Sequence, residues 1–300
     1  MDVKMRLREP LDVRIARALL QRWHRRGKGL LTRLYGRVLR HRDVVFEFEP
    51  GLFMPAEFED KIVYWCFADG WRLWDPIMHL SRELIQTGDI VVDVGANVGI
   101  WLMAAARRIG QTGHLYAFEP LASNVARLQR NLALNQITGV QVESLALSDH
   151  SGQTRFYAPS NGNSGMGSLG AHAGVIQICD VEATTLDSYC AAHAIEHVDL
   201  MKIDVEGAEE RVLAGGASLF QGVGAPPVMF EANDDLAANL NSSTCAAKQM
   251  LSDFGYQIYR VLPNRLNPVE IHERHWGEDL IALKPEHFLR HSELFQAFSR

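Results

Sequence analysis

The chain has 300 residues, of which 47% are hydrophobic and 22% charged, and this ordinary globular composition excludes a disordered or low-complexity protein. No run of apolar residues is long enough for a transmembrane helix. The net charge of −6 is unevenly divided, because residues 1–43 hold thirteen Lys and Arg against four acids and the remainder is acidic. An acidic body argues against a nucleic-acid-binding core, so we expect no nucleic-acid partner.

Residues 1–43 are expected to form a basic helical arm. Apolar residues recur at helical spacing over about residues 10–42, with arginines on the other face. Such an arm packs on the body or on a partner subunit, or it lies on an anionic membrane surface as an interfacial helix. The sequence has no C-x-x-C pair and no signal-peptide pattern, which favours a cytoplasmic location, with peripheral contact at the inner membrane surface as the alternative for the arm.

Residues 44–88 are expected to form an N-terminal cap or lid segment. Residues 44–48 and 61–65 are rich in β-branched and aromatic residues, which predicts two strands. Trp65, Trp71 and Trp74 crowd the same stretch and predict an apolar packing cluster.

Residues 89–300 alternate strands and helices, which predicts one α/β domain. Strands that are apolar on both faces, joined to helices by short links, are typical of a mostly parallel sheet with helices on both faces. We expect strands at residues 90–94, 114–118, 140–147, 198–203, 228–231, 256–261 and 280–283, and helices at residues 98–109, 121–134, 208–213 and 243–254.

One segment interrupts this alternation. Residues 152–181 contain two strand-like pieces around a loop rich in glycine, serine and asparagine. This pattern predicts a hairpin that carries a flexible flap, and loops of this length are often functional. His172 in the flap is a candidate mobile base, although a single loop histidine is more often a surface residue.

The strongest motif lies between the first strand of the α/β domain and the following helix, and it reads Asp93-Val-Gly95-Ala96-Asn97-Val-Gly99. Glycines in such a turn let the backbone approach a ligand and leave the N–H groups at the start of the helix free. A dinucleotide-binding turn needs glycine where Asn97 stands, and the Asp93 carboxylate would repel a pyrophosphate. The same carboxylate suits an ammonium or sulfonium group, so the sequence favours S-adenosylmethionine over NAD.

The next two strand ends complete a candidate cofactor site. Glu119-Pro120 ends the second strand, where a carboxylate can accept hydrogen bonds from both ribose hydroxyls. Ala146-Leu-Ser148-Asp149 ends the third strand, where the adenine edge would lie, although Ser148 and Asp149 are equally good turn residues.

With these motifs the chain resembles the FkbM family of S-adenosylmethionine-dependent methyltransferases. The resemblance covers about residues 75–285. The stretches that carry it are Gly88 to Gly99, Phe118-Glu119-Pro120, Ala146 to Gly152, Thr185-Leu-Asp187, Met201-Lys202-Ile-Asp204-Val-Glu206-Gly207-Ala-Glu209, Val228-Met-Phe-Glu231 and Asp279-Leu-Ile-Ala-Leu283.

The resemblance implies a Rossmann-like class I methyltransferase fold with a seven-stranded sheet whose last strand is antiparallel. Residues 256–261 and 280–283 would supply the final pair of strands. It also implies O-methylation of a hydroxyl. Matched by position, Asp93, Gly95, Asn97 and Gly99 would hold the methionine part of the cofactor and Glu119 its ribose.

Methylation of an alcohol needs a base that takes the hydroxyl proton. Asp204, Glu206 and Glu209 follow the fourth strand, and Glu231 ends the fifth. We expect Asp204 to contact the cofactor and position the acceptor, Glu206 or Glu231 to act as the base, and Glu209 to be a helix N-terminal acid. Asp204, Glu231 and Asn233 also offer oxygen ligands for Mg²⁺, but acids at strand ends are common without a metal, so we assign no metal site.

The sequence therefore predicts an O-methyltransferase that moves a methyl group from S-adenosylmethionine to a hydroxyl of a sugar, glycolipid or secondary metabolite. One alternative is an N-methyltransferase acting on a peptide or amide, which commonly carries Asn-Pro-Pro-Tyr-like residues where this chain has Asp204-Val-Glu-Gly. The other is a non-catalytic S-adenosylmethionine-binding module, which the presence of both Asp93 and Glu119 disfavours.

Overall fold

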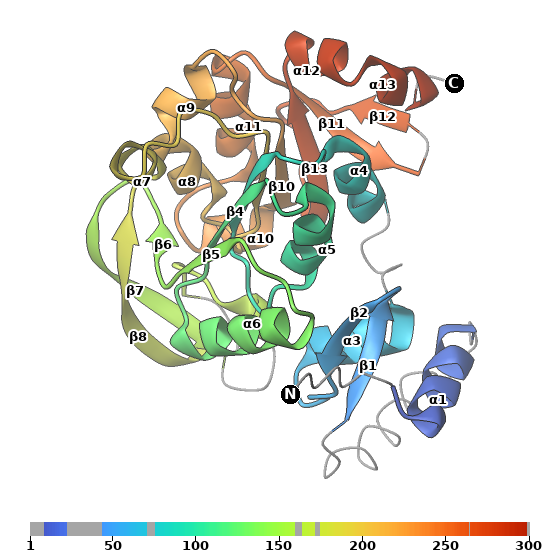
Figure 1. Cartoon of the computed structure of the whole chain (residues 1–300). Helices are drawn as coiled ribbons and strands as arrows, with labels where there is room; N and C mark the ends of the chain where they lie inside the picture. The colour runs from blue at the N-terminus through green and yellow to red at the C-terminus, as the bar shows by residue number, and fades with distance from the viewer. Residues whose placement is uncertain are drawn as a thin grey trace.

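A central α/β domain carries a small N-terminal cap at one end and a long β-hairpin at one side (Figure 1). The structure, a computed structural model, describes residues 9–22, 44–70, 76–159, 164–171, 175–263 and 265–298. The helices are α1 (Leu11–Arg22), α3 (Lys61–Asp69), α4 (Ile77–Leu84), α5 (Ile100–Ile109), α6 (Ala122–Leu134), α7 (Leu186–Ala192), α8 (Glu209–Gly215), α9 (Ala217–Gln221), α10 (Asp234–Ala238), α11 (Thr244–Asp253), α12 (Pro285–Arg290) and α13 (Ser292–Phe298), with a 3₁₀ turn at Ser164–Met166. The strands are β1 (Val45–Glu49), β2 (Leu52–Pro55), β3 (Ile90–Val94), β4 (His114–Phe118), β5 (Val140–Glu143), β6 (Ala146–Leu147), β7 (Gly152–Pro159), β8 (Val175–Thr184), β9 (Leu200–Ile203), β10 (Val228–Asn233), β11 (Gln257–Leu262), β12 (Arg265–Pro268) and β13 (Trp276–Leu283).

The central sheet has the strand order β12-β11-β13-β10-β9-β3-β4-β5. Strands β5, β4, β3, β9 and β10 are parallel, and β13 inserts antiparallel between β10 and β11. This confirms the predicted class I methyltransferase fold, in which the strand at residues 280–283 is antiparallel to its neighbours. The eighth strand, β12, is an additional edge strand paired with β11; it was not predicted because its residues, Arg-Leu-Asn-Pro, have little apolar character.

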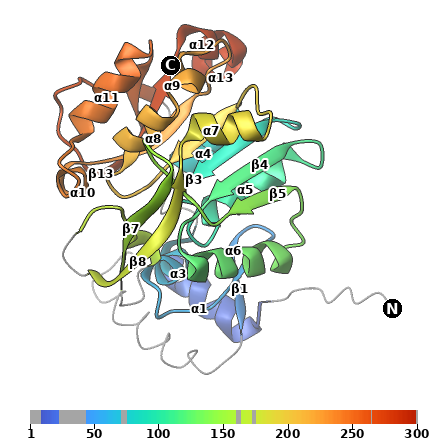
Figure 2. The ribbon, with the colours of Figure 1, turned by 90° about the vertical axis from the view of Figure 1, so that its left-hand side faces the viewer.

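Helices cover both faces of the sheet, as predicted (Figures 1 and 2). Alternate residues of each strand point to opposite faces. On one face, residues such as Val91 and Leu200 pack with α4, α5, α6 and the cap. On the other face, residues such as Val92 and Met201 pack with α7, α8, α9 and α11. Because both faces are buried, the carboxyl ends of the parallel strands are the natural place for a ligand crevice.

Two predicted strands take another form. Residues 61–65 are not a strand but the start of α3, because the Asp60 carboxylate accepts a hydrogen bond from the N–H of Ile62 (3.0 Å) and caps a helix whose Val63, Cys66 and Phe67 face the core. The predicted strand at residues 140–147 is split between β5 in the central sheet and β6 in a three-stranded sheet with β8 and β7. The predicted hairpin at residues 152–181 is present and longer than expected, as β7 and β8.

The cap, formed by β1, β2 and α3, is held on the α/β domain by specific polar contacts. The side-chain amide of Asn135 accepts from the N–H of Phe53 and donates to its C=O, both at 2.7 Å. The Arg127 guanidinium of α6 donates to Glu57 (2.9 Å) and to Asp60 (2.6 Å). These contacts fix the orientation of α3 above the end of the sheet.

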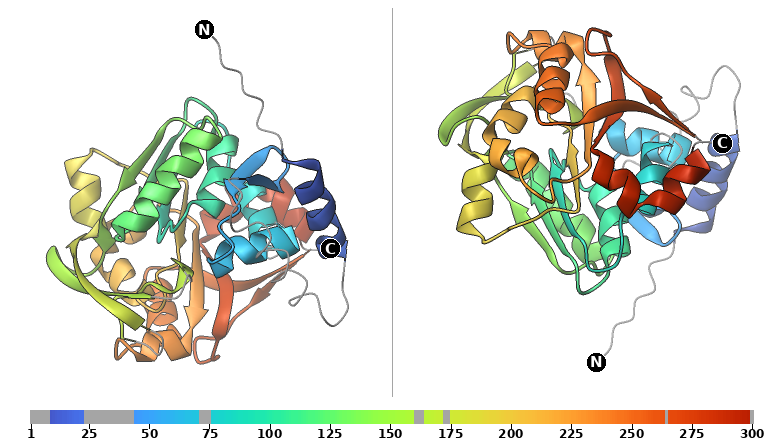
Figure 3. Two further views of the ribbon diagram at one scale, coloured as in Figure 1. Left: turned by 90° about the horizontal axis from the view of Figure 1, so that it is seen from below. Right: turned by 90° about the horizontal axis from the view of Figure 1, so that it is seen from above.

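The described part of the predicted basic arm is α1, which packs beside the cap at the edge of the molecule (Figure 3). Residues 23–43 lie outside the described residues, as do Trp71 and Trp74 of the predicted aromatic cluster. Trp65 is 39% exposed, so it is not part of the core. None of the described helices has the length and apolar character needed to cross a membrane.

Candidate active site

The loop that follows β3 folds back onto the end of the neighbouring strand β4. The N–H groups of Gly95 and Ala96 both donate to the C=O of Phe118, at 2.9 and 3.0 Å. Asn97 and Gly99 have positive φ values of 51° and 86°, and α5 begins directly after them. The loop therefore has a fixed shape at the carboxyl edge of the sheet, where the sequence predicted the cofactor site.

Gly95 is required by the packing of this loop against β9. A Cβ atom built on Gly95 would lie 1.8 Å from the C=O oxygen of Asp204, and its φ of +84° is one that L-residues rarely adopt. The sequence alone explained this glycine by a close approach to a ligand. The structure shows a close approach of two protein segments, which brings Asp204 directly beside the loop that begins at Asp93.

Two adjoining cavities open at this edge of the sheet. The wide cavity has a volume of about 340 Å³ and the narrow cavity about 40 Å³. Five residues line both: Gly95, Asn97, Gly165, Asp204 and Glu206. The wide cavity is further lined by Ile62, Ile77, Met78, Asp93, Ala96, Val98, Ile100, Trp101, Lys202, Glu231, Gly277, Glu278 and Asp279. The narrow cavity is further lined by residues that include Phe118, Glu119, Pro120, Asn124, Ala146, Leu147, Phe156 and Leu169.

Asp93 is a buried carboxylate with an unsatisfied oxygen. The residue is 1% exposed, and no described residue donates a hydrogen bond to its Oδ1. Lys202 Nζ lies 4.0 Å from that oxygen. Burial raises the pKa of Asp93 to about 6, although the positive charge of Lys202 opposes the rise. A carboxylate in this state gains most from a ligand that brings a cationic donor.

Glu119 organises the entrance to the narrow cavity. Its carboxylate accepts hydrogen bonds from the N–H of Asn97 (3.0 Å), the N–H of Leu121 (2.9 Å) and the side-chain amide of Asn124 (3.3 Å). Burial nevertheless raises its pKa to about 7. Pro120 and Ala146 line the same cavity, so the structure brings three predicted cofactor residues together.

The predicted catalytic residues Asp204, Glu206 and Glu231 meet in the wide cavity. Each contributes a carboxylate oxygen to a group whose members lie within 4.8 Å of one another. Burial and the neighbouring carboxylates raise the pKa values of Glu206 and Glu231 well above the ordinary value. Each ionised carboxylate disfavours ionisation of its neighbours, which adds to the effect of burial on Glu206 and Glu231.

Lys202 places a cation inside this acidic group. Its Nζ donates to Asp204 Oδ2 at 2.7 Å. Burial alone would lower the pKa of Lys202, but Asp204 and Asp93 raise it, and the net result is a raised pKa. The side chain therefore stays charged and links the Asp93 loop to the acidic group.

Glu206 and Glu209 have different roles in the segment between β9 and α8. Glu206 has a φ of 54°, and its C=O accepts a hydrogen bond from Ser168 Oγ of the flap (2.7 Å). Glu209 Oε1 accepts from the N–H groups of Val205 (3.1 Å) and Gly207 (3.3 Å), and burial raises its pKa to about 7. Glu209 therefore holds the shape of the segment that presents Glu206 to the cavity.

Some residues singled out in the sequence do not line either cavity. Gly99 faces Leu128, whose Cγ would lie 3.1 Å from an added Cβ. Ser148 is fully buried and its hydroxyl donates to Asp149 (3.0 Å). Asn233 Oδ1 accepts from the N–H of Leu236 (3.3 Å) and caps α10. The oxygen ligands that lie close together are therefore those of Asp204, Glu206 and Glu231, with Glu206 in place of Asn233. His172 lies outside the described residues.

The sequence also left several lining residues unassigned. Lys202 had a usable signal, because residues two apart on a strand point to the same face and Asp204 was already a candidate. Asp279 lies on β13 as the register partner of the candidate Glu231, and burial raises its pKa to about 6. Ile62, Ile77 and Met78 come from the cap segment and α4, and no local pattern shows that these residues reach the site.

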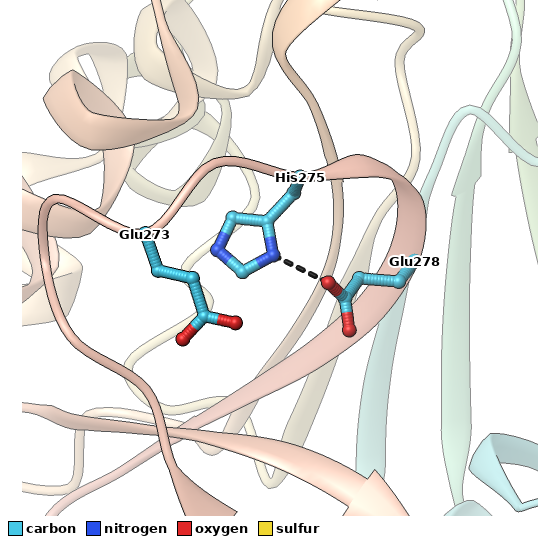
Figure 4. A group of neighbouring side chains, drawn as sticks. All are labelled: Glu273, His275 and Glu278. Carbon is cyan, nitrogen blue, oxygen red and sulfur yellow. Dashed lines mark hydrogen bonds and ion pairs between the residues drawn. The ribbon is translucent and has the colours of Figure 1, made fainter.

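A second polar group, Glu273, His275 and Glu278, lies beside the wide cavity (Figure 4). His275 is fully buried, with Nδ1 2.5 Å from Glu278 and Nε2 2.9 Å from Lys248 Nζ. Arg260 pairs with both glutamates. Since Arg260 already pairs with both glutamates and Lys248 Nζ contacts His275, this group serves as an anchor for the start of β13, where Gly277 to Asp279 form part of the cavity lining.

The comparisons with known proteins agree with this geometry. Residues 93–258, more than half of the chain, match the family model described as the methyltransferase FkbM domain. The chain belongs to the FkbM family of methyltransferases. The matched region begins at Asp93 and contains Glu119, Asp204 and Glu231.

Two relatives illustrate the reach of this similarity. The 2-O-methyltransferase NoeI of Sinorhizobium fredii is 27% identical over 172 residues, which cover 50% of this chain and 68% of the relative. The 31-O-demethyl-FK506 methyltransferase FkbM of Streptomyces tacrolimicus is 32% identical over 160 residues, which cover 44% of this chain and 60% of the relative. Among solved structures, an S-adenosylmethionine-dependent O-methyltransferase from Thermotoga maritima is 14% identical, with a TM-score of 0.38 over 69% of this chain and 63% of that chain.

Membership in the FkbM family implies S-adenosylmethionine as the cofactor, and the residues at the carboxyl edge of the sheet fit it. The unsatisfied Asp93 oxygen faces the cavity where an ammonium group would be held. The narrow cavity offers apolar walls from Phe118, Leu147 and Phe156 together with the Glu119 carboxylate, which suits an adenosine.

Proposed function

We propose that this FkbM-family protein is an O-methyltransferase that acts on a neutral or cationic hydroxyl compound, of which a sugar, a glycolipid or a secondary metabolite are the candidates. The observation that carries the proposal is the group formed by Asp204, Glu206 and Glu231 in the wide cavity, next to the loop of Asp93. The names of the two relatives describe O-methylation, which supports the same chemistry for this chain.

The acidic group supplies the base that an alcohol needs. S-adenosylmethionine supplies an electrophilic methyl group on a sulfonium. Glu206 and Glu231 have raised pKa values because they are buried and lie close to other carboxylates. A base must lie within reach of the proton that it takes, and Glu206 and Glu231 both line the wide cavity, so the ionised form of either is suited to accept the hydroxyl proton. Lys202 Nζ donates to Asp204 and holds that carboxylate in place within the group.

The charge of the cavity limits the acceptor. Six acids line it, namely Asp93, Asp204, Glu206, Glu231, Glu278 and Asp279, and Lys202 is the single basic residue among the lining residues. An acceptor with a carboxylate or phosphate near the reacting hydroxyl would be repelled, whereas carboxylates bind sugar hydroxyls and ammonium groups well. Ile62, Ile77 and Met78 add apolar surface to the lining, which favours an acceptor with both polar and apolar groups.

The same three carboxylates also have the oxygen ligands that Mg²⁺ uses. Lys202 Nζ, 2.7 Å from Asp204, already offers a cation to the group. Methyl transfer is therefore assayed with EDTA and with added Mg²⁺. If activity survives EDTA, Lys202 is the cation that neutralises the three carboxylates. If activity is lost in EDTA and restored only by Mg²⁺, a metal ion has that role.

The experiment that tests the proposal starts with calorimetry of the purified chain and S-adenosylhomocysteine, for which we expect a Kd near 1 μM, about −8 kcal/mol. Methyl transfer from labelled S-adenosylmethionine is then compared for a neutral sugar, an amino sugar and a uronic acid built on one scaffold. We expect the uronic acid to be the poorest acceptor. Absence of S-adenosylhomocysteine binding would contradict the cofactor site itself.

Variants of the acidic group test the base. Glu231→Gln and Glu206→Gln keep the shape of the side chain, and the variant that removes the base should lower kcat by about 10²- to 10⁴-fold while S-adenosylhomocysteine binding is retained. Asp235→Asn, an exposed acid on α10 outside both cavities, is the matched control. If both glutamine variants keep kcat within threefold of the unaltered protein, the base is elsewhere.

A further inference from the structure

We propose that α1 docks the protein on an anionic lipid surface. The outer face of this helix carries a row of aliphatic side chains, Leu11, Ile15 and Leu19, which follow one another at four-residue intervals. They are 71%, 51% and 63% exposed. Residues four apart lie on one face of a helix, so the three side chains form one continuous apolar stripe.

The inner face of α1 holds the stripe in a fixed orientation. Val13 and Leu20, on the opposite side of the helix, are 0% and 6% exposed and belong to the core that includes the cap. Arg17 donates to Glu9 through two hydrogen bonds of 2.8 Å, and Gln21 donates to the C=O of Phe67 in α3 (3.4 Å). Because this side is occupied by the cap, the aliphatic stripe can only face outward.

The charge around the stripe points to an anionic partner. Arg14 and Arg22 are exposed and lie three residues after Leu11 and Leu19, which places each beside the stripe; exposed Asp12 lies at its other border. Residues 1–43 hold thirteen Lys and Arg against four acids, although the chain as a whole has a net charge of −6. An apolar stripe bordered by arginines matches the boundary between lipid headgroups and acyl chains, where the aliphatic groups insert and the guanidinium groups reach phosphate.

The position of α1 connects this contact with the active site. α1 lies against the cap at the edge of the molecule (Figures 1 and 3), and α3 of the cap supplies Ile62 to the wide cavity. A protein bound through α1 therefore brings the cap side of its cavity toward the bilayer.

The test is co-sedimentation of the full chain with vesicles of phosphatidylcholine alone or of equal parts phosphatidylcholine and phosphatidylglycerol. We expect binding to the anionic vesicles only, weakened by added salt because the charge contribution is screened. The variant Leu11→Gln/Ile15→Gln/Leu19→Gln should bind at least tenfold more weakly. Its matched control, Ile178→Gln/Val223→Gln/Leu289→Gln, removes three other exposed aliphatic side chains and should bind like the unaltered chain.

Hydrogen exchange of the unaltered chain keeps the proposal testable if the stripe variant fails to fold. Anionic vesicles should slow exchange at residues 11–22. The proposal is overturned if the unaltered chain does not bind anionic vesicles, if the stripe variant binds as well as the control, or if vesicles leave the exchange of α1 unchanged. A dimer interface is the other outcome that overturns it. In that case light scattering would show that the unaltered chain is a dimer and the stripe variant is not, and neither protein would bind vesicles. S-adenosylhomocysteine binding is measured in parallel, so failure here is distinguishable from failure of the methyltransferase proposal.

Discussion

The loop after β3 and the cap line the same wide cavity, but their residues are constrained by different forces. The loop is fixed by the backbone: Gly95 has no room for a side chain against the Asp204 carbonyl, and two N–H groups bind the Phe118 carbonyl. The cap contributes Ile62 through side-chain packing, and contacts such as Asn135 with Phe53 hold it in place. Backbone constraints tolerate almost no substitution, whereas apolar packing tolerates many. The side of the cavity that we propose for the cofactor is therefore rigid, and we expect acceptor choice to vary on the cap side.

The largest effect is expected for Gly95→Ala. A Cβ at this position would overlap the Asp204 carbonyl at 1.8 Å, which neither segment can relieve without breaking the sheet edge. We expect a loss of unfolding free energy of more than about 3 kcal/mol, measured by urea denaturation.

Gly224→Ala is the matched control for that measurement. Gly224 has a similar φ of +81° but open space around it, so the control measures the strain of positive φ alone, about 1 kcal/mol. Equal losses in the two variants would show that the loop is not constrained by this packing.

Asp93→Asn is expected to weaken S-adenosylhomocysteine binding by about 10- to 100-fold, the contribution of a charged hydrogen bond. The reason is that Asp93 Oδ1 is buried and faces the cavity without a hydrogen-bond donor among the described residues. Calorimetry at pH 8 measures the change, with Asp235→Asn as the control acid outside the cavities. Affinity within twofold of the unaltered chain would remove Asp93 from the cofactor site.

Ile62→Ala should affect the acceptor and not the cofactor. Ile62 lines only the wide cavity, where it also contacts the flap, since an added Cβ at Gly165 would lie 2.9 Å from its Cδ1. We expect KM for the acceptor to rise about three- to tenfold with loss of apolar contact, while S-adenosylhomocysteine affinity stays within twofold. Ile178→Ala, an exposed position on the hairpin, should change neither. If Ile62→Ala weakens the binding of the acceptor and of S-adenosylhomocysteine equally, the cap side and the loop side of the cavity do not have separate roles.

The sequence predicted the rigid side of the site better than the cap side, and the reason is physical. Asp93, Glu119 and Asp204 follow buried parallel strands, and the carboxyl ends of such strands meet at one edge of the sheet whatever the rest of the chain does. No comparable rule of topology predicts where the residues of the cap lie. Residues 61–65 have strand propensity, yet Asp60 caps a helix there, and that helix is held over the site by contacts with residues about 70 to 80 positions away, such as Arg127 with Asp60. Long-range contacts of this kind leave no periodic pattern in a sequence.

The smallest effect is expected for Glu209, whose pKa is raised to about 7 because it is buried, although the N–H groups of Val205 and Gly207 oppose the rise. A pKa above the ordinary value of 4.5 means that the folded protein binds this proton more tightly than the unfolded chain does. The resulting stabilisation is complete below about pH 4.5 and is lost as the pH rises through about 7. Glu209→Gln keeps the accepting oxygen and lacks the titration, so the stability of the unaltered chain relative to this variant should fall by up to about 1.4 kcal/mol between pH 6 and pH 8. Urea denaturation at the two pH values measures it, with Glu196→Gln, an exposed residue, expected to follow the unaltered chain. A difference that does not change with pH would mean that Glu209 is ionised throughout, and the loop that presents Glu206 would then depend on a charged carboxylate.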